Sequence, residues 1–139
     1  MATKQRRKLK SFTPIVFAVS KDTLEFLKTA PREAIEAFKK GTNTPTDWYN
    51  VSFRVKSGLE IAILVYEEIT ITDLKEAMKA CLSIRERFLK TNVWISNDSE
   101  IEIIELAVEA TGVMFEETTR RIQLDASHIA YTYMKKLIN

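Results

Sequence analysis

The clearest helical pattern in the chain is TDLKEAMKACLSIRERFLKTN, at residues 72–92. Its apolar side chains recur every three to four positions, which places them on one face of a helix. These apolar residues are Leu74, Ala77, Met78, Cys81, Leu82, Ile84, Phe88 and Leu89. Thr72 is placed to cap the first turn with its hydroxyl. The stretch therefore predicts an amphipathic helix that begins at about Thr72 and packs one face against a core.

The composition of the whole chain agrees with a helical fold. Apolar residues make up 45% of the 139 residues and charged residues 29%, as in ordinary globular proteins. Three Gly and three Pro are too few for the many tight turns of a sandwich or barrel. We predict an all-α fold, an irregular bundle of four to six helices. It forms one domain over residues 15–139 and follows a basic flexible tail, residues 1–14.

Helix start and stop signals divide the first part of the chain. Ser20 is a candidate N-cap, Pro31 is expected to break or restart the helix that follows, and Gly41 to close the next one. Thr44-Pro45 then supplies another start, because Thr caps well and Pro fits the first helical position. These signals predict two short helices between residues 20 and 41 and a new helix from residue 45.

Residues 50–66 fit two patterns. One set of apolar residues recurs at helical spacing, namely Trp48, Val51, Val55, Leu59, Ala62 and Tyr66. Apolar residues also alternate on both sides of Lys56-Ser57-Gly58, as in a hairpin with Gly in its turn. This alternating set comprises Val51, Phe53, Val55, Leu59, Ile61, Ile63 and Val65. We prefer one long helix, because a strong start signal precedes it and helices surround it. The alternative is an α+β fold with a hairpin at about 50–66.

The last third of the chain carries one long helical pattern. Asn97, with Glu100 three residues later, is a variant of the capping box that begins a helix. An unbroken helix from there to the C-terminus would be about 60 Å long at the usual rise per residue. This exceeds the width of a small domain. We therefore expect either a break near Asp125 or a projecting helix that pairs with another chain.

Charge is distributed unevenly along the chain. The net charge is +2, and the first ten residues carry +5, so the remainder carries 2 − 5 = −3. The residues of this basic cluster are Lys4, Arg6, Arg7, Lys8 and Lys10. Clustered Lys and Arg bind phosphate backbones through counterion release, so the tail is a candidate nucleic-acid contact.

The sequence offers little for catalysis. His128 is the single histidine and Cys81 the single cysteine, so neither a two-histidine metal site nor an intrachain disulfide can form. Cys81 lies on an apolar helix face, where we expect a buried side chain. Glycine-rich phosphate-binding motifs are lacking. We predict a protein that is not an enzyme and that uses no metal or cofactor.

The apolar runs are short. The longest, Ile61 to Tyr66, falls far below the ~20 residues of a membrane span. The apolar stretch Ile15–Val19 is too short for a signal-peptide core. We expect a cytoplasmic protein without membrane contact.

The C-terminal pattern supplies candidate interface residues. Arg and Tyr are enriched at binding hot spots, and they occur here as Arg120, Arg121, Tyr131 and Tyr133. A protein partner or a second copy of the chain is the expected binder. We therefore predict a non-enzymatic regulatory or adaptor protein that acts by protein–protein binding. The alternative is a nucleic-acid-binding protein that uses the basic tail.

Part of the second half has a recognisable pattern. It comprises ACLSIRERF at 80–88, TNVW at 91–94, residues 96–100 and TTRR at 118–121, with Asp47-Trp48 and Gly58-Leu59 as further matches. The pattern resembles small, uncharacterised helical proteins of bacterial and phage genomes. The resemblance implies a long helix at residues 50–66 and a link to phage or mobile elements. It implies no activity.

Overall fold

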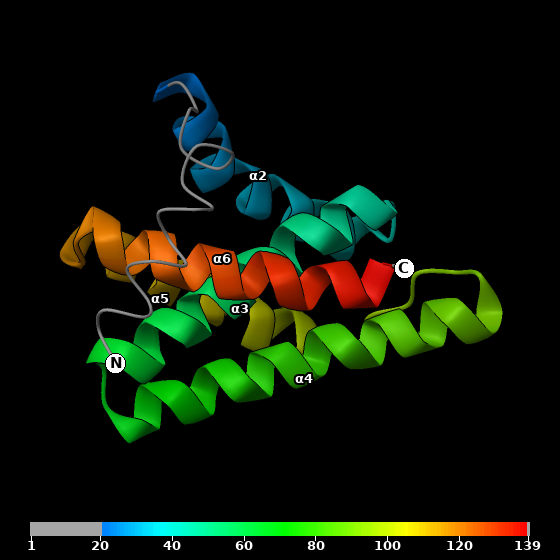
Figure 1. The fold of residues 1–139 in the computed structure, drawn as a ribbon. Helices are drawn as coiled ribbons and strands as arrows, with labels where there is room; N and C mark the ends of the chain where they lie inside the picture. Colours follow the sequence, from blue (N-terminus) through cyan, green and yellow to red (C-terminus); the bar gives the residue numbers. More distant parts are fainter. Residues whose placement is uncertain (1–20, 139) are drawn as a thin grey trace.

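The computed structural model describes residues 21–138, with side chains from residue 30 onward. The basic tail, the apolar stretch Ile15–Val19 and the expected cap Ser20 lie outside the described residues. Five helices and no strand occur between residues 21 and 138 (Figure 1). They are α2 (Lys21–Lys40), α3 (Pro45–Val65), α4 (Glu68–Thr91), α5 (Asp98–Glu117) and α6 (Arg120–Ile138). The predicted all-α bundle is confirmed.

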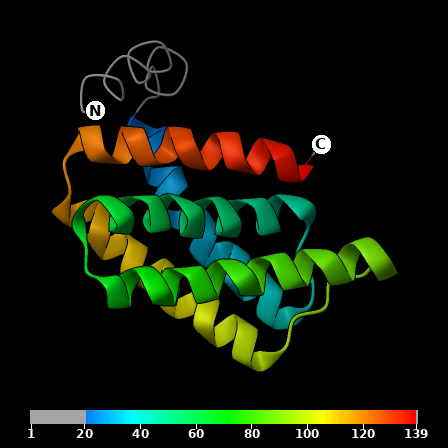
Figure 2. The same ribbon diagram turned by 60° about the horizontal axis from the view of Figure 1, so that its bottom comes forward.

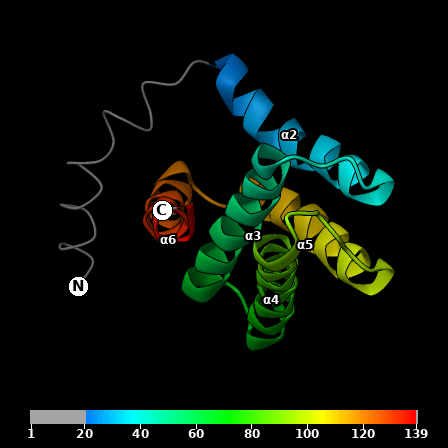
Figure 3. The same cartoon turned by 90° about the vertical axis from the view of Figure 1, so that its right-hand side faces the viewer.

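The helices are arranged around α3. Figure 2 shows α6, α3 and α4 side by side in one layer, with α2 and α5 crossing behind them. The turned view of Figure 3 places α3 between α6 on one side and α5 on the other. Helices α2, α4, α5 and α6 all pack on α3. The central helix therefore has to bury side chains in nearly every direction.

This burial explains why residues 50–66 fit two sequence patterns. Thr44 and Asp47 form a reciprocal capping box, with the Thr44 hydroxyl accepting from the Asp47 amide at 3.2 Å. The helix continues without a break through Lys56-Ser57-Gly58, and both Ser57 and Gly58 are buried within it. A helix that is covered on several faces needs apolar residues outside one stripe, and Phe53 and Ile61 mimic strand alternation for this reason. The pattern continues through Ile63 and Val65, which are exposed. The hairpin alternative is not supported.

Two helices approach closely at Gly58 of α3. A Cβ at this position would lie 2.1 Å from Cγ2 of Thr111 on α5, much closer than atoms can pack. Thr111 is fully buried and its hydroxyl donates to the carbonyl oxygen of Val108 at 2.7 Å. The absence of a side chain at Gly58 therefore sets the distance between α3 and α5.

The expected break at Pro31 is wrong, because α2 runs through it from Lys21 to Lys40. Proline removes one backbone donor, but Pro31 lies between the buried residues Ala30 and Ala34. Packing of this face offsets the lost hydrogen bond. The helix closes at Gly41, as predicted, with a positive φ of 70° that glycine adopts without strain.

The expected start of α4 at Thr72 is also wrong. The helix begins at Glu68, where a negative charge in the first turn interacts favourably with the helix dipole. The extra turn brings Ile71 against the core. The Thr72 hydroxyl does not cap the helix but donates to the carbonyl oxygen of Glu68 at 3.0 Å. The helix ends at Asn92, whose left-handed φ of 59° stops the chain of helical bonds.

The long C-terminal pattern breaks, but before the expected position near Asp125. Helix α5 ends at Glu117, and its C-cap residue Thr118 has an extended backbone (φ −105°, ψ 159°). The side-chain amide of Gln123 donates to the carbonyl oxygens of Phe115 at 2.6 Å and Thr118 at 3.1 Å. Carbonyls at the end of a helix need such partners. Gln123 supplies them, so α5 can end without Gly or Pro.

Gly58→Ala is expected to lower the free energy of unfolding by about 1–3 kcal/mol, because the new methyl group overlaps the Thr111 side chain. Gly112→Ala on α5 is the matched control, since a Cβ there comes no closer than 3.6 Å to a neighbour. The free energy of unfolding of this control should rise by up to about 1 kcal/mol, because alanine has a higher helix propensity than glycine. Urea unfolding followed by circular dichroism measures both. Equal or higher stability of Gly58→Ala would contradict the close approach.

Candidate functional site

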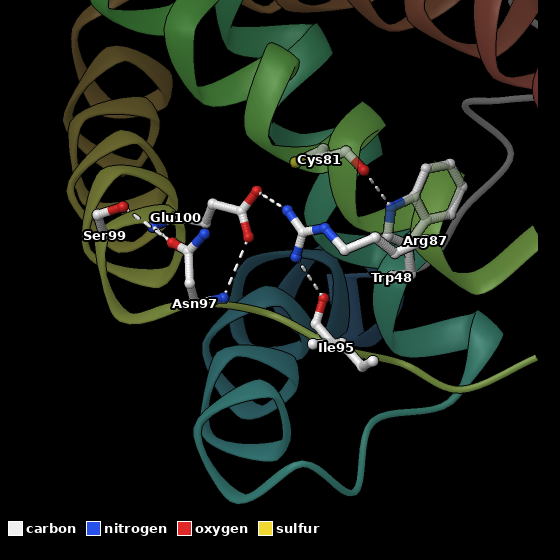
Figure 4. Close-up of polar contacts among 7 residues, drawn as sticks. All are labelled: Trp48, Cys81, Arg87, Ile95, Asn97, Ser99 and Glu100. Carbon is white, nitrogen blue, oxygen red and sulfur yellow. Dashed lines mark hydrogen bonds and ion pairs between the residues drawn. The ribbon is translucent and has the colours of Figure 1, made fainter. Parts of the chain in front are cut away.

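The connection between α4 and α5 forms a hydrogen-bonded corner (Figure 4). The guanidinium of Arg87 donates to the carbonyl oxygen of Ile95 at 2.7 Å and forms an ion pair with Glu100. The same Glu100 carboxylate accepts from the backbone N–H of Asn97 at 3.1 Å. The side-chain oxygen of Asn97 accepts in turn from the backbone N–H of Glu100 at 2.8 Å. The predicted capping box at Asn97 is confirmed. Arg87 extends it into a clamp that fixes the whole corner.

Aromatic stacking ties this corner to the core. Trp94 in the connection stacks on Phe88 of α4, with ring centroids 4.0 Å apart. Its other neighbour is Trp48 of α3 at 6.3 Å. The indole N–H of Trp48 donates to the carbonyl oxygen of Cys81 at 2.9 Å, inside the core. Stacked and hydrogen-bonded aromatic rings hold a fixed geometry, so the corner presents its remaining side chains rigidly.

A second polar group lies inside the bundle. Arg54 of α3 is buried, and its Nε–H donates to the Thr111 hydroxyl at 2.9 Å. Its guanidinium lies 4.2 Å from the centroid of the Phe115 ring. Burial, with a smaller contribution from Arg32, lowers the pKa of Arg54 to about 10. We missed this residue in the sequence, although its place between the buried Val51 and Val55 indicates that it faces inward.

The predicted site residues do not form one site. The tail residues Lys4, Arg6, Arg7, Lys8 and Lys10 lie outside the described part of the chain. Arg120 and Arg121 are exposed at the start of α6. Tyr131 is 40% exposed, about 15 Å further along the helix at the usual rise per residue. Tyr133 is half-buried, with the Lys56 ammonium 4.4 Å from its ring centroid. The structure thus separates the two arginines from the two tyrosines.

Ten of the twelve exposed large aliphatic side chains among the described residues form three sets instead, and the other two, Ile129 and Ile138, lie on α6. The α3–α4 end comprises Ile63, Leu64, Val65 and Ile69, and the α4–α5 corner presents Leu89, Val93 and Ile95. The outer face of α5 presents Ile103, Leu106 and Val113. We did not separate these residues from the core positions in the sequence. The signal was present on α5, where Ile103, Leu106 and Val113 alternate with the buried positions, which are Glu100, Ile104, Ala107, Val108, Thr111 and Met114. Exposed apolar sets of this kind are typical of interaction surfaces.

The groups able to support chemistry are dispersed. No cluster of three or more His, Cys, Asp or Glu suited to a metal ion occurs among residues that the structure describes. His128 is half-buried on α6, and Cys81 is fully buried on α4, as predicted. None of the helices from α2 to α6 combines the length and apolar character that crossing a bilayer requires.

Comparison with family models, with curated proteins and with solved structures finds no significant match for this chain. The resemblance to small helical proteins of bacterial and phage genomes therefore stays a prediction.

Arg87→Ala is expected to lower the free energy of unfolding by about 1–3 kcal/mol, because the Glu100 carboxylate, 12% exposed, loses its charged partner. Lys79→Ala is the control, since its ion pair with Glu76 is exposed and contributes little. Urea unfolding of both variants gives the comparison. If the two variants lose equal stability, Arg87 does not clamp the corner.

The Cys81 thiol should make stability fall at alkaline pH. Burial raises its pKa from 9.0 to about 12, so between these values the unfolded chain has lost a proton that the folded chain keeps. Folding stability therefore declines as pH rises, by up to about 1.4 kcal/mol per pH unit from this group. Urea unfolding at pH 8.5 and 10.5 should give a smaller loss for Cys81→Ala than for the native chain. Equal losses would show that the thiol ionises alike in both states.

Proposed function

We propose that this protein is a regulatory or adaptor protein that acts by binding another protein and not by catalysis. The observation that carries the proposal is the three sets of exposed aliphatic side chains. At the α3–α4 end, three consecutive residues, Ile63, Leu64 and Val65, are each exposed by 42–52%, and Ile69 by 68%. Runs of exposed apolar residues cost solubility unless they serve a function. Covering them with a partner removes apolar surface from water, which favours association.

The rest of the described structure agrees with a binding role. The Arg87 clamp and the stacked Trp94 hold the α4–α5 corner in one shape, so Val93 and Ile95 are presented at little entropic cost. The one cysteine is buried, and its raised pKa keeps the thiol protonated and poorly nucleophilic at neutral pH. The nucleic-acid alternative is supported by the sequence of the basic tail alone.

Photo-cross-linking in the native host tests this function. A photoreactive amino acid is placed in the full chain at Leu64, Val93 or Leu106, one position from each exposed set, and at Lys75 as an exposed polar control on α4. We expect a discrete protein adduct from at least one of the three apolar positions and none from Lys75. Mass spectrometry identifies the partner. If none of the three apolar positions yields a protein adduct, the proposed function is wrong.

A further inference from the structure

Helix α5 differs from the other helices in its charge. Its sequence, DSEIEIIELAVEATGVMFEE, contains seven Asp and Glu and no Lys or Arg. Three of the acidic side chains are used within the bundle. Glu100 pairs with Arg87, Glu105 accepts from Lys39 at 2.7 Å, and Glu117 accepts from the Tyr66 hydroxyl at 2.8 Å. The other acidic side chains of α5 include Glu102, Glu109 and Glu116, which are exposed on its outer surface.

The outer face of α5 carries a regular apolar seam. Ile103, Leu106, Ala110 and Val113 follow each other at intervals of three, four and three residues, and all four are exposed. This is the spacing of alternating a and d positions in a coiled coil. The core of the protein uses a different face, with Ile104, Ala107, Val108, Thr111 and Met114 buried. The seam is therefore not required to complete the protein's own core.

Three glutamates form a row along one flank of this seam. Glu102, Glu109 and Glu116 are spaced seven residues apart and are all exposed. With Ile103 and Ala110 at a positions, each of the three occupies a g position, which flanks the seam and selects the partner by charge. Within residues 30–138 none of them takes part in an ion pair.

The charge of the row decides which occupant fits. In an antiparallel pair of two α5 helices, the glutamates of one copy would face those of the other, and like charges at g positions repel. A nucleic acid would meet the same repulsion. Lys or Arg on a partner helix would instead form ion pairs along the flank while its apolar residues cover the seam.

We propose that the outer face of α5 binds an amphipathic helix of another protein, with apolar residues at coiled-coil spacing and Lys or Arg beside them. This inference rests on the proposed protein-binding function and names the surface and the partner chemistry. The seam from Ile103 to Val113 is about 15 Å long. So short a contact gives reversible association.

Peptide binding to the full chain tests the inference. The probe is a fluorescent synthetic helix of three heptads with Leu at a and d and Lys at e and g. The controls are the same helix with Glu at e and g, and a Lys peptide of identical composition with its sequence scrambled. Fluorescence anisotropy should show binding of the Lys helix alone, weakening as NaCl rises. Equal binding of the scrambled peptide, or no binding of the Lys helix, would overturn the inference.

Two sets of variants locate the binding. The double variant Leu106→Gln with Val113→Gln removes apolar surface without changing charge. It should weaken the binding of the Lys helix at least about tenfold. Ile138→Gln, a change at a comparably exposed position on α6 outside the three exposed sets, should leave binding unchanged. The triple variant Glu102→Lys, Glu109→Lys and Glu116→Lys should exchange the preference from the Lys helix to the Glu helix. Thermal melting confirms that each variant is folded.

The peptide-binding experiments on α5 and the cross-linking test of the proposed function can fail independently of each other. Unchanged binding by Leu106→Gln with Val113→Gln, or an unaltered preference in the triple variant, would remove the α5 assignment. Protein adducts at Leu64 or Val93 would then leave the protein-binding function standing. If cross-linking fails at every apolar position as well, both the function and the inference are wrong.

Discussion

The close approach of α3 and α5 at Gly58 is the contact on which the rest of the bundle depends. Gly58 lets Thr111 pack against the backbone of α3, and Thr111 in turn accepts a hydrogen bond from Arg54. A larger residue would separate the two helices and expose this buried guanidinium. Because α2, α4 and α6 also pack on α3, a shift of this helix would be felt throughout the core.

The exposed seam on α5 follows from how this contact fixes the orientation of the helix. With Ile104, Val108 and Thr111 turned toward the core, the residues on the opposite side of the helix have to face solvent. Leu106 and Val113 are 61% and 53% exposed for this reason. The Arg87 clamp fixes the start of the same helix. The fold thus holds an apolar seam and its glutamate flank in a defined position.

Features encoded by a few neighbouring residues could be predicted from the sequence. The cap at Thr44, the capping box at Asn97 and the glycine stop at Gly41 need only local chemistry. Features decided by tertiary packing could not. Helix α2 passes through Pro31 because its buried face compensates for a lost hydrogen bond. Helix α5 ends at Glu117 because the Gln123 side chain reaches back to carbonyl oxygens at the helix end.

The candidate site was predicted less well than the fold, because tertiary packing decides which side chains are brought together at the surface. Arg120, Arg121, Tyr131 and Tyr133 were selected by residue type, but the length of α6 separates them into two groups. The seam on α5 was not recognised, although the spacing of the core positions on this helix leaves Ile103, Leu106 and Val113 off the buried face. Only the direction in which α5 is turned distinguishes Leu106 from Ala107.

Helix α3 is the buried centre of the bundle and is covered by all the other described helices. Native-state hydrogen exchange measures this burial, because amides in the most protected element exchange only through global unfolding. The amides from Val51 to Ala62 should be the slowest in the chain, slower than those of α2 and α6. Exchange of these amides as fast as in the peripheral helices would contradict the claim.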